Sequence, residues 1–295
     1  MEKKKKNSSV KLIAIVVMLL LCVGAAAYIV RIVKDKKAAE PEPAEEPVAE
    51  EVQEPEDTSA EDEMKAKLAH IMTNSGSSSE EKYTMAALDA AVEGGSVCLS
   101  MPVVAAKDGT LYVAYDDYLY DMTGMDGYLT GMTDGQIAEV KTKGGSDIVK
   151  LSDVFGKYGT DISYVIEIRY PNERNIMAFV DTVKAAGVAD VTSLSSYYFD
   201  SINSVENELP DMSKIFLSEN EVDLSQAMAA ENVDTISVNK ELMTDENLAA
   251  VHESGKKFSA WTLNSDEEIR KAVSMGLDSY FTDEGALAVS IEKGE

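Results

Sequence analysis

From residue 67 onward, short apolar runs of strand length alternate with longer stretches of helical periodicity. Nine runs are of strand type: 67–71, 97–104, 111–116, 162–169, 190–195, 214–219, 234–239, 257–263 and 279–283. Helical stretches between them include 83–95, 175–187, 223–232, 244–256 and 265–276. Parallel strands need a long crossover between them, so this alternation predicts a parallel sheet with helices outside it. The length and the strand number predict a TIM-type (β/α)8 barrel rather than an open sheet.

Local signals mark the ends of several elements. Ser265 precedes Glu268 by three residues, which is a capping box, and Thr244 opens another helical stretch. Glycines close three of the stretches: Gly187, Gly255 and Gly276. Lys107-Asp108-Gly109 predicts a hairpin between 97–104 and 111–116. Because nine strand candidates exceed eight, we expect the arm 111–116 to lie outside the barrel or to merge with it.

The N-terminus carries a membrane signal. Residues 12–30 are uncharged and, at about 1.5 Å per residue, span roughly the 30 Å of a hydrocarbon core. We therefore predict a basic tail at 1–11 and an uncleaved transmembrane helix at 12–33, with the C-terminal domain outside the cell. A cleaved signal peptide is the alternative, although its apolar region is usually shorter. Lipid attachment at Cys22 is disfavoured because Leu21 is not small.

Charge separates the remaining segments. Residues 34–63 are rich in Pro and Glu, which predicts a disordered stalk. Residues 64–295, the predicted barrel domain, hold 39 acidic and 18 basic side chains, and the whole chain has a net charge of −26. This charge argues against nucleic acid as a partner, and against broad contact with anionic lipid. The two cysteines, Cys22 and Cys98, are not expected to form a disulfide.

In such a barrel the functional side chains lie at the carboxyl ends of the strands. The residues predicted at those positions are His70, Ser100 or Pro102, Tyr115, Asp116, Glu167, Arg169, Ser193, Glu219, Asn239, Trp261, Asn264 and Asp283.

Several blocks together carry a family resemblance. They lie at 70–133, 150–159, 164–169, 191–202 and 258–287. In order and spacing they resemble a glycerophosphodiester phosphodiesterase domain, over essentially residues 68–288. The resemblance implies a TIM barrel of the phospholipase C-like type. It also implies hydrolysis of glycerophosphodiesters to glycerol 3-phosphate and an alcohol, usually with a divalent cation.

The family's first strand ends His-Arg-Gly, and the resemblance assigns this motif to His70, Ile71 and Met72. A Glu-Asn-Thr motif follows, where this chain has Lys82, Tyr83 and Thr84. On this alignment the histidine and the threonine remain, while the phosphate-binding arginine is lost.

The metal-binding motif is also altered. The Glu-x-Asp of the second strand falls on Ser100 and Pro102, and the His-Asp of the next strand falls on Tyr115 and Asp116. The fourth-strand Glu-x-Lys is represented by Glu167 and Arg169. The late Trp-Thr-x-Asn and closing Thr-Asp motifs are kept, at Trp261, Thr262, Asn264, Thr282 and Asp283.

These substitutions leave one carboxylate, whereas Ca²⁺ and Mg²⁺ sites use several hard oxygen ligands. The predicted site has His70 as a residual catalytic group, Tyr115 replacing the family histidine, Arg169 and Trp261 as ligand contacts, and Glu167 as a weak metal ligand. The alternatives are a histidine held by a carboxylate, a Glu167–Arg169 ion pair and an apolar role for Trp261.

Two functions follow from this site. The first is a membrane-anchored pseudoenzyme that binds a glycerophosphodiester or another small polar ligand, or serves as a scaffold, without a cofactor. The second is an active phosphodiesterase that uses Ca²⁺ or Mg²⁺.

Overall fold

The computed structural model describes residues 58–294. The predicted tail 1–11, the transmembrane helix 12–33, Cys22 and most of the predicted linker 34–63 lie outside the described residues. Across 58–294, none of the helices combines the length and apolar character needed to cross a membrane.

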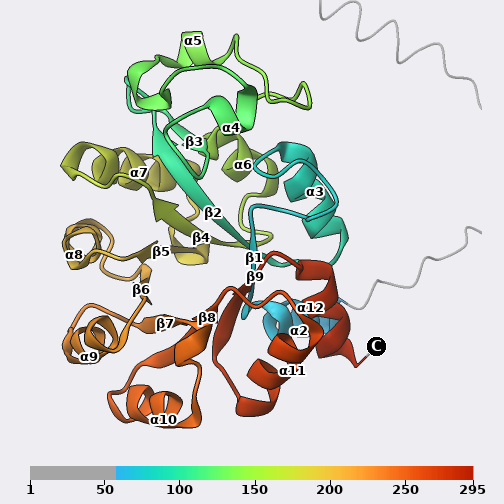
Figure 1. Ribbon diagram of the computed structural model, residues 1–295, viewed down its shortest axis with the longest axis vertical. Helices are drawn as coiled ribbons and strands as arrows, with labels where there is room; N and C mark the ends of the chain where they lie inside the picture. The colour runs from blue at the N-terminus through green and yellow to red at the C-terminus, as the bar shows by residue number, and fades with distance from the viewer. Residues whose placement is uncertain (1–57, 295) are drawn as a thin grey trace, which may run out of the picture. The chain divides into compact units, whose positions relative to one another are not determined.

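Eight parallel strands close into a barrel, because β1 pairs with β9 on one side and with β2 on the other (Figure 1). Around the barrel they are β1 (Ile71–Asn74), β2 (Cys98–Ala105), β4 (Ser163–Ile168), β5 (Thr192–Ser196), β6 (Ser213–Ser218), β7 (Thr235–Asn239), β8 (Lys257–Trp261) and β9 (Ser279–Thr282). The predicted TIM-type barrel is confirmed.

The hairpin arm lies outside the barrel. Among the strands, β3 (Leu111–Val113) pairs with β2 alone, in antiparallel register, after a turn in which Gly109 has a φ of +96°. An insertion follows, with α4 (Tyr120–Thr123), the 3₁₀ helix η1 (Leu129–Gly131) and α5 (Asp134–Ile137). It packs on its own small core, which includes Tyr112, Leu119, Leu129, Ile137 and Ile148.

Helices surround the barrel (Figure 1). They are α3 (Met85–Glu93), α6 (Leu151–Tyr158), α7 (Glu173–Ala186), α8 (Phe199–Glu208), α9 (Glu221–Ala229), α10 (Asp245–Glu253), α11 (Asp266–Met275) and α12 (Gly285–Lys293), with short 3₁₀ turns η2 (Ala189–Val191) and η3 (Lys240–Leu242). The capping box of Ser265 and Glu268 is present, and Thr244 caps α10. Gly187 and Gly276 end their helices in the left-handed conformation.

Two apolar layers hold the barrel. The larger lies between strands and helices, where Leu99, Phe179 and Phe258 are fully buried. The smaller fills the barrel interior with Met72, Cys98, Val165, Ile215, Leu217 and Phe281. Burial raises the pKa of the Cys98 thiol to about 12, so this side chain packs as a small apolar group.

The predicted strand 67–71 is wrong. Helix α2 (Thr58–Leu68) occupies its first residues and begins inside the predicted linker 34–63. Its sequence holds two each of Ala, Glu and Lys, which are good helix formers. Leu68 is buried between exposed neighbours, as one face of a helix requires, and β1 starts only at Ile71. This difference moves the C-terminal end of β1 to Asn74.

Candidate functional site

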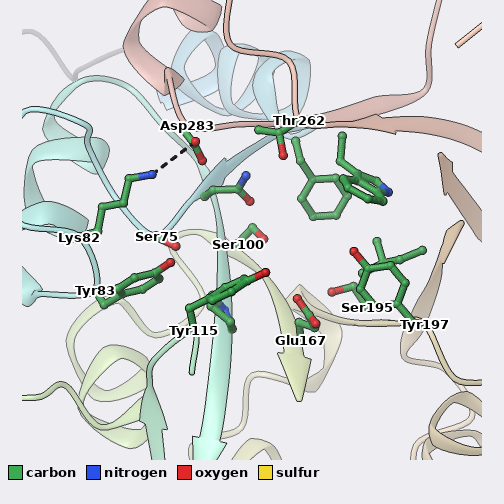
Figure 2. Close-up of a pocket in the computed structure, with 15 residues that line it drawn as sticks. Ser75, Lys82, Tyr83, Ser100, Tyr115, Glu167, Ser195, Tyr197, Thr262 and Asp283 are labelled. Carbon is green, nitrogen blue, oxygen red and sulfur yellow. Dashed lines mark ion pairs between the residues drawn. The ribbon is translucent and has the colours of Figure 1, made fainter. Parts of the chain in front are cut away.

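A cavity of about 270 Å³ opens at the carboxyl ends of the barrel strands (Figure 2). Its walls combine aromatic rings with hydroxyl, amide and charged groups. The lining residues are Asn74, Ser75, Lys82, Tyr83, Ser100, Pro102, Tyr115, Glu167, Ser195, Tyr197, Leu217, Trp261, Thr262, Phe281 and Asp283.

The end of β1 carries Asn74, Ser75 and Gly76. The Ser75 amide donates to the Ser100 carbonyl at 2.8 Å, which ties β1 to β2. Gly76 has a φ of +92°, and a Cβ there would lie 2.4 Å from the Ala87 carbonyl carbon. Only glycine fits this turn without strain. Asn-Ser-Gly therefore stands where the resemblance expects His-Arg-Gly, and the glycine is the part that remains.

The predicted place of His70 at the barrel mouth is wrong. His70 precedes β1, at the opposite end of the barrel from the cavity, where it borders a separate depression of about 420 Å³. Its Nε2 lies 2.8 Å from Oε1 of Glu292, and its ring meets Tyr280 edge-on at 5.7 Å. The motif alignment rested on His70, whereas the turn-forming Asn-Ser-Gly after an apolar run marks the end of the strand.

The structure brings the altered motif positions together. Ser100 and Pro102 of β2 line the cavity with Tyr115, which follows β3. In the β2–β4 register Pro102 lies directly opposite Glu167. In Figure 2 the Glu167 carboxylate lies between Tyr115 and Tyr197. These four predicted positions therefore do face one cavity.

Arg169 holds Glu167 in place. Its Nη1 donates to Glu167 Oε1 at 2.5 Å, and its guanidinium carbon lies 4.5 Å from the centre of the Tyr115 ring. Burial alone would lower the pKa of Arg169, because it disfavours the charged guanidinium. The attraction of the adjacent Glu167 carboxylate is the stronger effect, so the pKa of Arg169 is raised. The alternative prediction of a Glu167–Arg169 ion pair matches this geometry.

A second ion pair closes the other wall. Lys82 Nζ lies 3.4 Å from Asp283 Oδ2, as the dashed line in Figure 2 marks. Asn264 supports Asp283 by donating from Nδ2 to Oδ2 at 3.1 Å and accepting from its backbone amide at 2.9 Å. Lys82 stands where the resemblance expects glutamate. The cavity wall thus carries the Lys82–Asp283 pair and Glu167, whose partner Arg169 is not itself a lining residue.

Aromatic side chains form much of the remaining wall. Trp261 donates from Nε1 to the Ser237 carbonyl at 3.1 Å and meets Tyr197 edge-on at 6.0 Å. Burial raises the pKa of the Tyr83 and Tyr197 hydroxyls. Both are therefore neutral at physiological pH, so they can donate and accept hydrogen bonds but cannot serve as ready bases.

Other residues predicted at the strand ends fall elsewhere. Ser193 lies near the start of β5 and borders the depression beside His70. Asp116 binds the Tyr170 hydroxyl at 2.7 Å and does not line the cavity. Lys82, Tyr83, Ser195 and Tyr197 line the cavity without having been predicted as site residues, because each comes from a loop or strand end whose direction the sequence pattern does not show.

The residues present do not fit a divalent cation. Within 58–294, no group of three or more His, Cys, Asp or Glu side chains is arranged to hold a metal ion. Ser100 and Pro102 supply no carboxylate, and Glu167 already accepts from Arg169. A Ca²⁺ or Mg²⁺ site needs several oxygen ligands, usually with more than one carboxylate.

Comparison with known proteins identifies the family and leaves His70 outside the matched residues. The profile of the glycerophosphoryl diester phosphodiesterase family matches residues 74–286, so the match begins at the last residue of β1 and leaves out His70.

Two relatives in sequence are similar over most of their length. A protein of Bacillus subtilis strain 168 called "Uncharacterized protein YqiK" is 22% identical over 244 residues, covering 77% of this chain and 100% of that protein. A glycerophosphodiester phosphodiesterase of Bacillus altitudinis is 23% identical over 229 residues, covering 71% of this chain and 92% of that protein.

Solved structures share the fold. A glycerophosphodiester phosphodiesterase of Agrobacterium tumefaciens strain C58 has a TM-score of 0.66 at 17% identity, covering 75% of this chain and 99% of that chain. A phosphodiesterase of Oleispira antarctica, solved with the product sn-glycerol-3-phosphate, has a TM-score of 0.68 at 19% identity, covering 79% of this chain and 99% of that chain.

Proposed function

This chain belongs to the glycerophosphoryl diester phosphodiesterase family, and from that premise we propose that its barrel binds a small polar ligand while hydrolysis of phosphodiesters is impaired. The observation that carries the proposal is the set of residues around Glu167. Ser100, Pro102 and Tyr115 face this carboxylate in the cavity, at positions where the family resemblance expects two metal ligands and a histidine.

The chemistry of hydrolysis needs groups that this cavity lacks. Phosphodiester cleavage needs a proton acceptor and a proton donor near the phosphorus, and positive charge that stabilises the transition state. Here Asn74 and Tyr115 replace the two family histidines, and Ser75 replaces the arginine. Lys82 and Arg169 are cationic, but each is already paired with a carboxylate.

The same cavity keeps the features of a binding site. It is concave, it is partly aromatic, and it presents hydroxyl and amide groups from several strands. Gly76, Asn264 and Asp283 keep the turns at the cavity mouth in shape. These features support ligand binding without turnover.

The proposal includes a cellular setting. The apolar segment 12–33, which is uncharged from residue 12 to residue 30, anchors the chain in the membrane, the acidic segment 34–63 acts as a spacer, and the barrel lies outside the cell. The acidic charge disfavours nucleic acid. The barrel's partners would then be a small polar ligand or another protein for which it serves as a scaffold.

The second candidate is residual phosphodiesterase activity. The name of the Bacillus altitudinis relative, glycerophosphodiester phosphodiesterase, favours it. The test is release of glycerol 3-phosphate from glycerophosphocholine by the full chain in detergent, with Ca²⁺, with Mg²⁺ and with EDTA. We expect no release above that of heat-treated protein. Metal-dependent release that disappears in Glu167→Gln would overturn the proposal and establish the second candidate.

A further inference from the structure

Exposed tyrosines gather around the cavity mouth. Nine large hydrophobic side chains are exposed within 58–294, and six of them are tyrosines: Tyr115, Tyr118, Tyr120, Tyr128, Tyr170 and Tyr198. All six follow the carboxyl end of a barrel strand or belong to the insertion after β3. Scattered exposed apolar residues need no explanation, but a cluster beside a cavity indicates a contact surface.

The insertion holds three of these rings in fixed positions. Tyr118 and Tyr128 are 5.3 Å apart between ring centres, and Tyr118 and Tyr120 are stacked at 6.1 Å. Leu119, between Tyr118 and Tyr120, and Leu129, directly after Tyr128, are fully buried, so the tyrosines beside them turn outward. The Leu119 amide donates to the Gly127 carbonyl at 2.9 Å, which ties the two segments together. A surface ordered before binding loses little entropy when a ligand arrives.

Asp116, the residue that follows Tyr115, links Tyr170 and the backbone of Tyr118 to the segment beside the cavity. Asp116 Oδ1 accepts from the Tyr170 hydroxyl at 2.7 Å and from the Tyr118 amide at 3.2 Å. The neighbouring residue Tyr115 lines the cavity itself. We call Tyr118, Tyr120, Tyr128 and Tyr170 the tyrosine surface. Tyr115 lies at its cavity side, and the insertion that carries Tyr118, Tyr120 and Tyr128 includes α4, which Figure 1 labels, and η1.

Charge decides which ligands suit this site. An anion in the cavity would have to draw Lys82 from Asp283 or Arg169 from Glu167, and the chain's net charge of −26 would repel it. A cationic ligand would compete with side chains of the protein for two of the aromatic rings. Arg169 already covers the Tyr115 ring, and Lys143 lies 5.5 Å from the centre of the Tyr120 ring. A neutral ligand meets neither obstacle.

We infer that the cavity and the tyrosine surface form one binding site for a neutral oligosaccharide. A sugar ring has an apolar face of C–H groups, which stacks on an aromatic ring, and an edge of hydroxyls. The cavity supplies hydrogen-bond partners for one terminal sugar through Asn74, Ser100 and Ser195. The following sugars lie on Tyr170, Tyr118 and Tyr128. This inference rests on the proposed function, since it names the ligand of that same cavity.

Trp261 gives the test a direct reporter. It is the only tryptophan in the chain and it lines the cavity. The full chain, kept in a detergent that contains no sugar, is titrated with hexasaccharides of β-linked glucose, of β-linked N-acetylglucosamine and of α-linked mannose. Binding is followed by calorimetry and by Trp261 emission. We expect at least one hexasaccharide to bind, with a change in Trp261 emission.

Substitutions separate the tyrosine surface from the cavity. We expect Tyr118→Ala and Tyr128→Ala each to weaken binding by about tenfold, the size of one lost stacking contact. Tyr128→Phe keeps the ring and should bind within about threefold of the parent chain. Tyr170→Ala is a further variant, outside the insertion, should either insertion variant fail to fold. Absence of binding by all three hexasaccharides at millimolar concentration, or equal binding by folded alanine variants, would overturn the inference.

A parallel titration with glycerophosphocholine keeps the two proposals distinct. Binding of glycerophosphocholine alone, without turnover, would leave the proposed function standing and refute the oligosaccharide. Turnover of glycerophosphocholine would refute the proposed function, while the hexasaccharide titrations would still decide the ligand.

Discussion

Arg169 lies with its guanidinium carbon 4.5 Å from the centre of the Tyr115 ring while its Nη1 binds Glu167 Oε1 at 2.5 Å. A histidine at position 115, as the family resemblance expects, would be repelled by Arg169 whenever it was protonated. The tyrosine ring instead offers a negative face to the cation. The tyrosine at 115 is therefore compatible with the Glu167–Arg169 ion pair, and Tyr115 is a packing partner of Arg169.

We predict that Glu167→Gln destabilises the fold by about 1–3 kcal/mol, because it leaves the Arg169 charge without its carboxylate. The side chains of Arg169 and Glu167 are only 25% and 20% exposed. The measurement is urea unfolding at neutral pH. The matched control is Glu208→Gln, which breaks a more exposed pair with Lys184 and should cost less than about 1 kcal/mol. Equal losses in the two variants would contradict the prediction.

The two ends of the barrel should respond separately to substitution. His70→Ala removes the contacts with Glu292 and Tyr280, so we expect a loss of about 1 kcal/mol in unfolding free energy. Trp261 emission should not change, because His70 lies at the far end of the barrel. Tyr197→Leu removes the ring packed against Trp261 and should shift the emission. A shift in His70→Ala of similar size would show that His70 does influence the cavity.

Sequence patterns predicted most of the barrel and only part of the site. Buried parallel strands read as continuous apolar runs, so the strands from β2 to β9 lie within the predicted ranges apart from small shifts at their ends. The position of strand β1 was predicted wrongly, because a strand of four residues shows little periodicity and the motif alignment was based on His70. The tyrosine surface was not predicted, because the exposure of each tyrosine depends on which side chains of the insertion pack into its core. The alternation of Tyr118, Leu119 and Tyr120 indicates the exposed face only once the burial of Leu119 is known.

We predict that Glu268 makes stability depend on pH in the acid range. Its hydrogen bond with Lys240, and then the backbone amides of Asn264 and Ser265, lower its pKa from 4.5 to about 2. A carboxylate with a lowered folded pKa stabilises the protein above its unfolded pKa, and this stabilisation is lost as the pH falls toward the folded pKa. Because Glu268 is partly exposed, solvent screening reduces the effect to about 1–2 kcal/mol.

The test compares Glu268→Gln with the parent chain. Glutamine can keep the capping-box bond at Ser265 and loses the charge that faces Lys240. We expect the variant to be less stable near pH 7 and the difference to shrink between about pH 4.5 and pH 2, by urea unfolding across that range. A difference that stays constant through this window would show that the charge of Glu268 is not its source.

Restoring carboxylates should create the metal site that the cavity lacks. Pro102 lies opposite Glu167 in the β2–β4 register, and Ser100 lies two positions earlier on the same face of β2. Pro102→Asp and Ser100→Glu together therefore place three carboxylates at one point of the cavity wall. We expect this double variant to bind Ca²⁺ or Mg²⁺ with a Kd of about 10⁻⁵ to 10⁻³ M and a stoichiometry near one.

Calorimetry and thermal unfolding measure this gain. Without metal, three close carboxylates repel one another, so the double variant should unfold at a lower temperature than the parent chain. Added Ca²⁺ should raise that temperature, because the ion binds only the folded state. The matched control is Ser100→Gln with Pro102→Asn, which has similar shapes without charge and should show no response to metal. Tight binding of Ca²⁺ or Mg²⁺ by the parent chain would mean that Glu167 already has other ligands, and that the cavity is a working metal site.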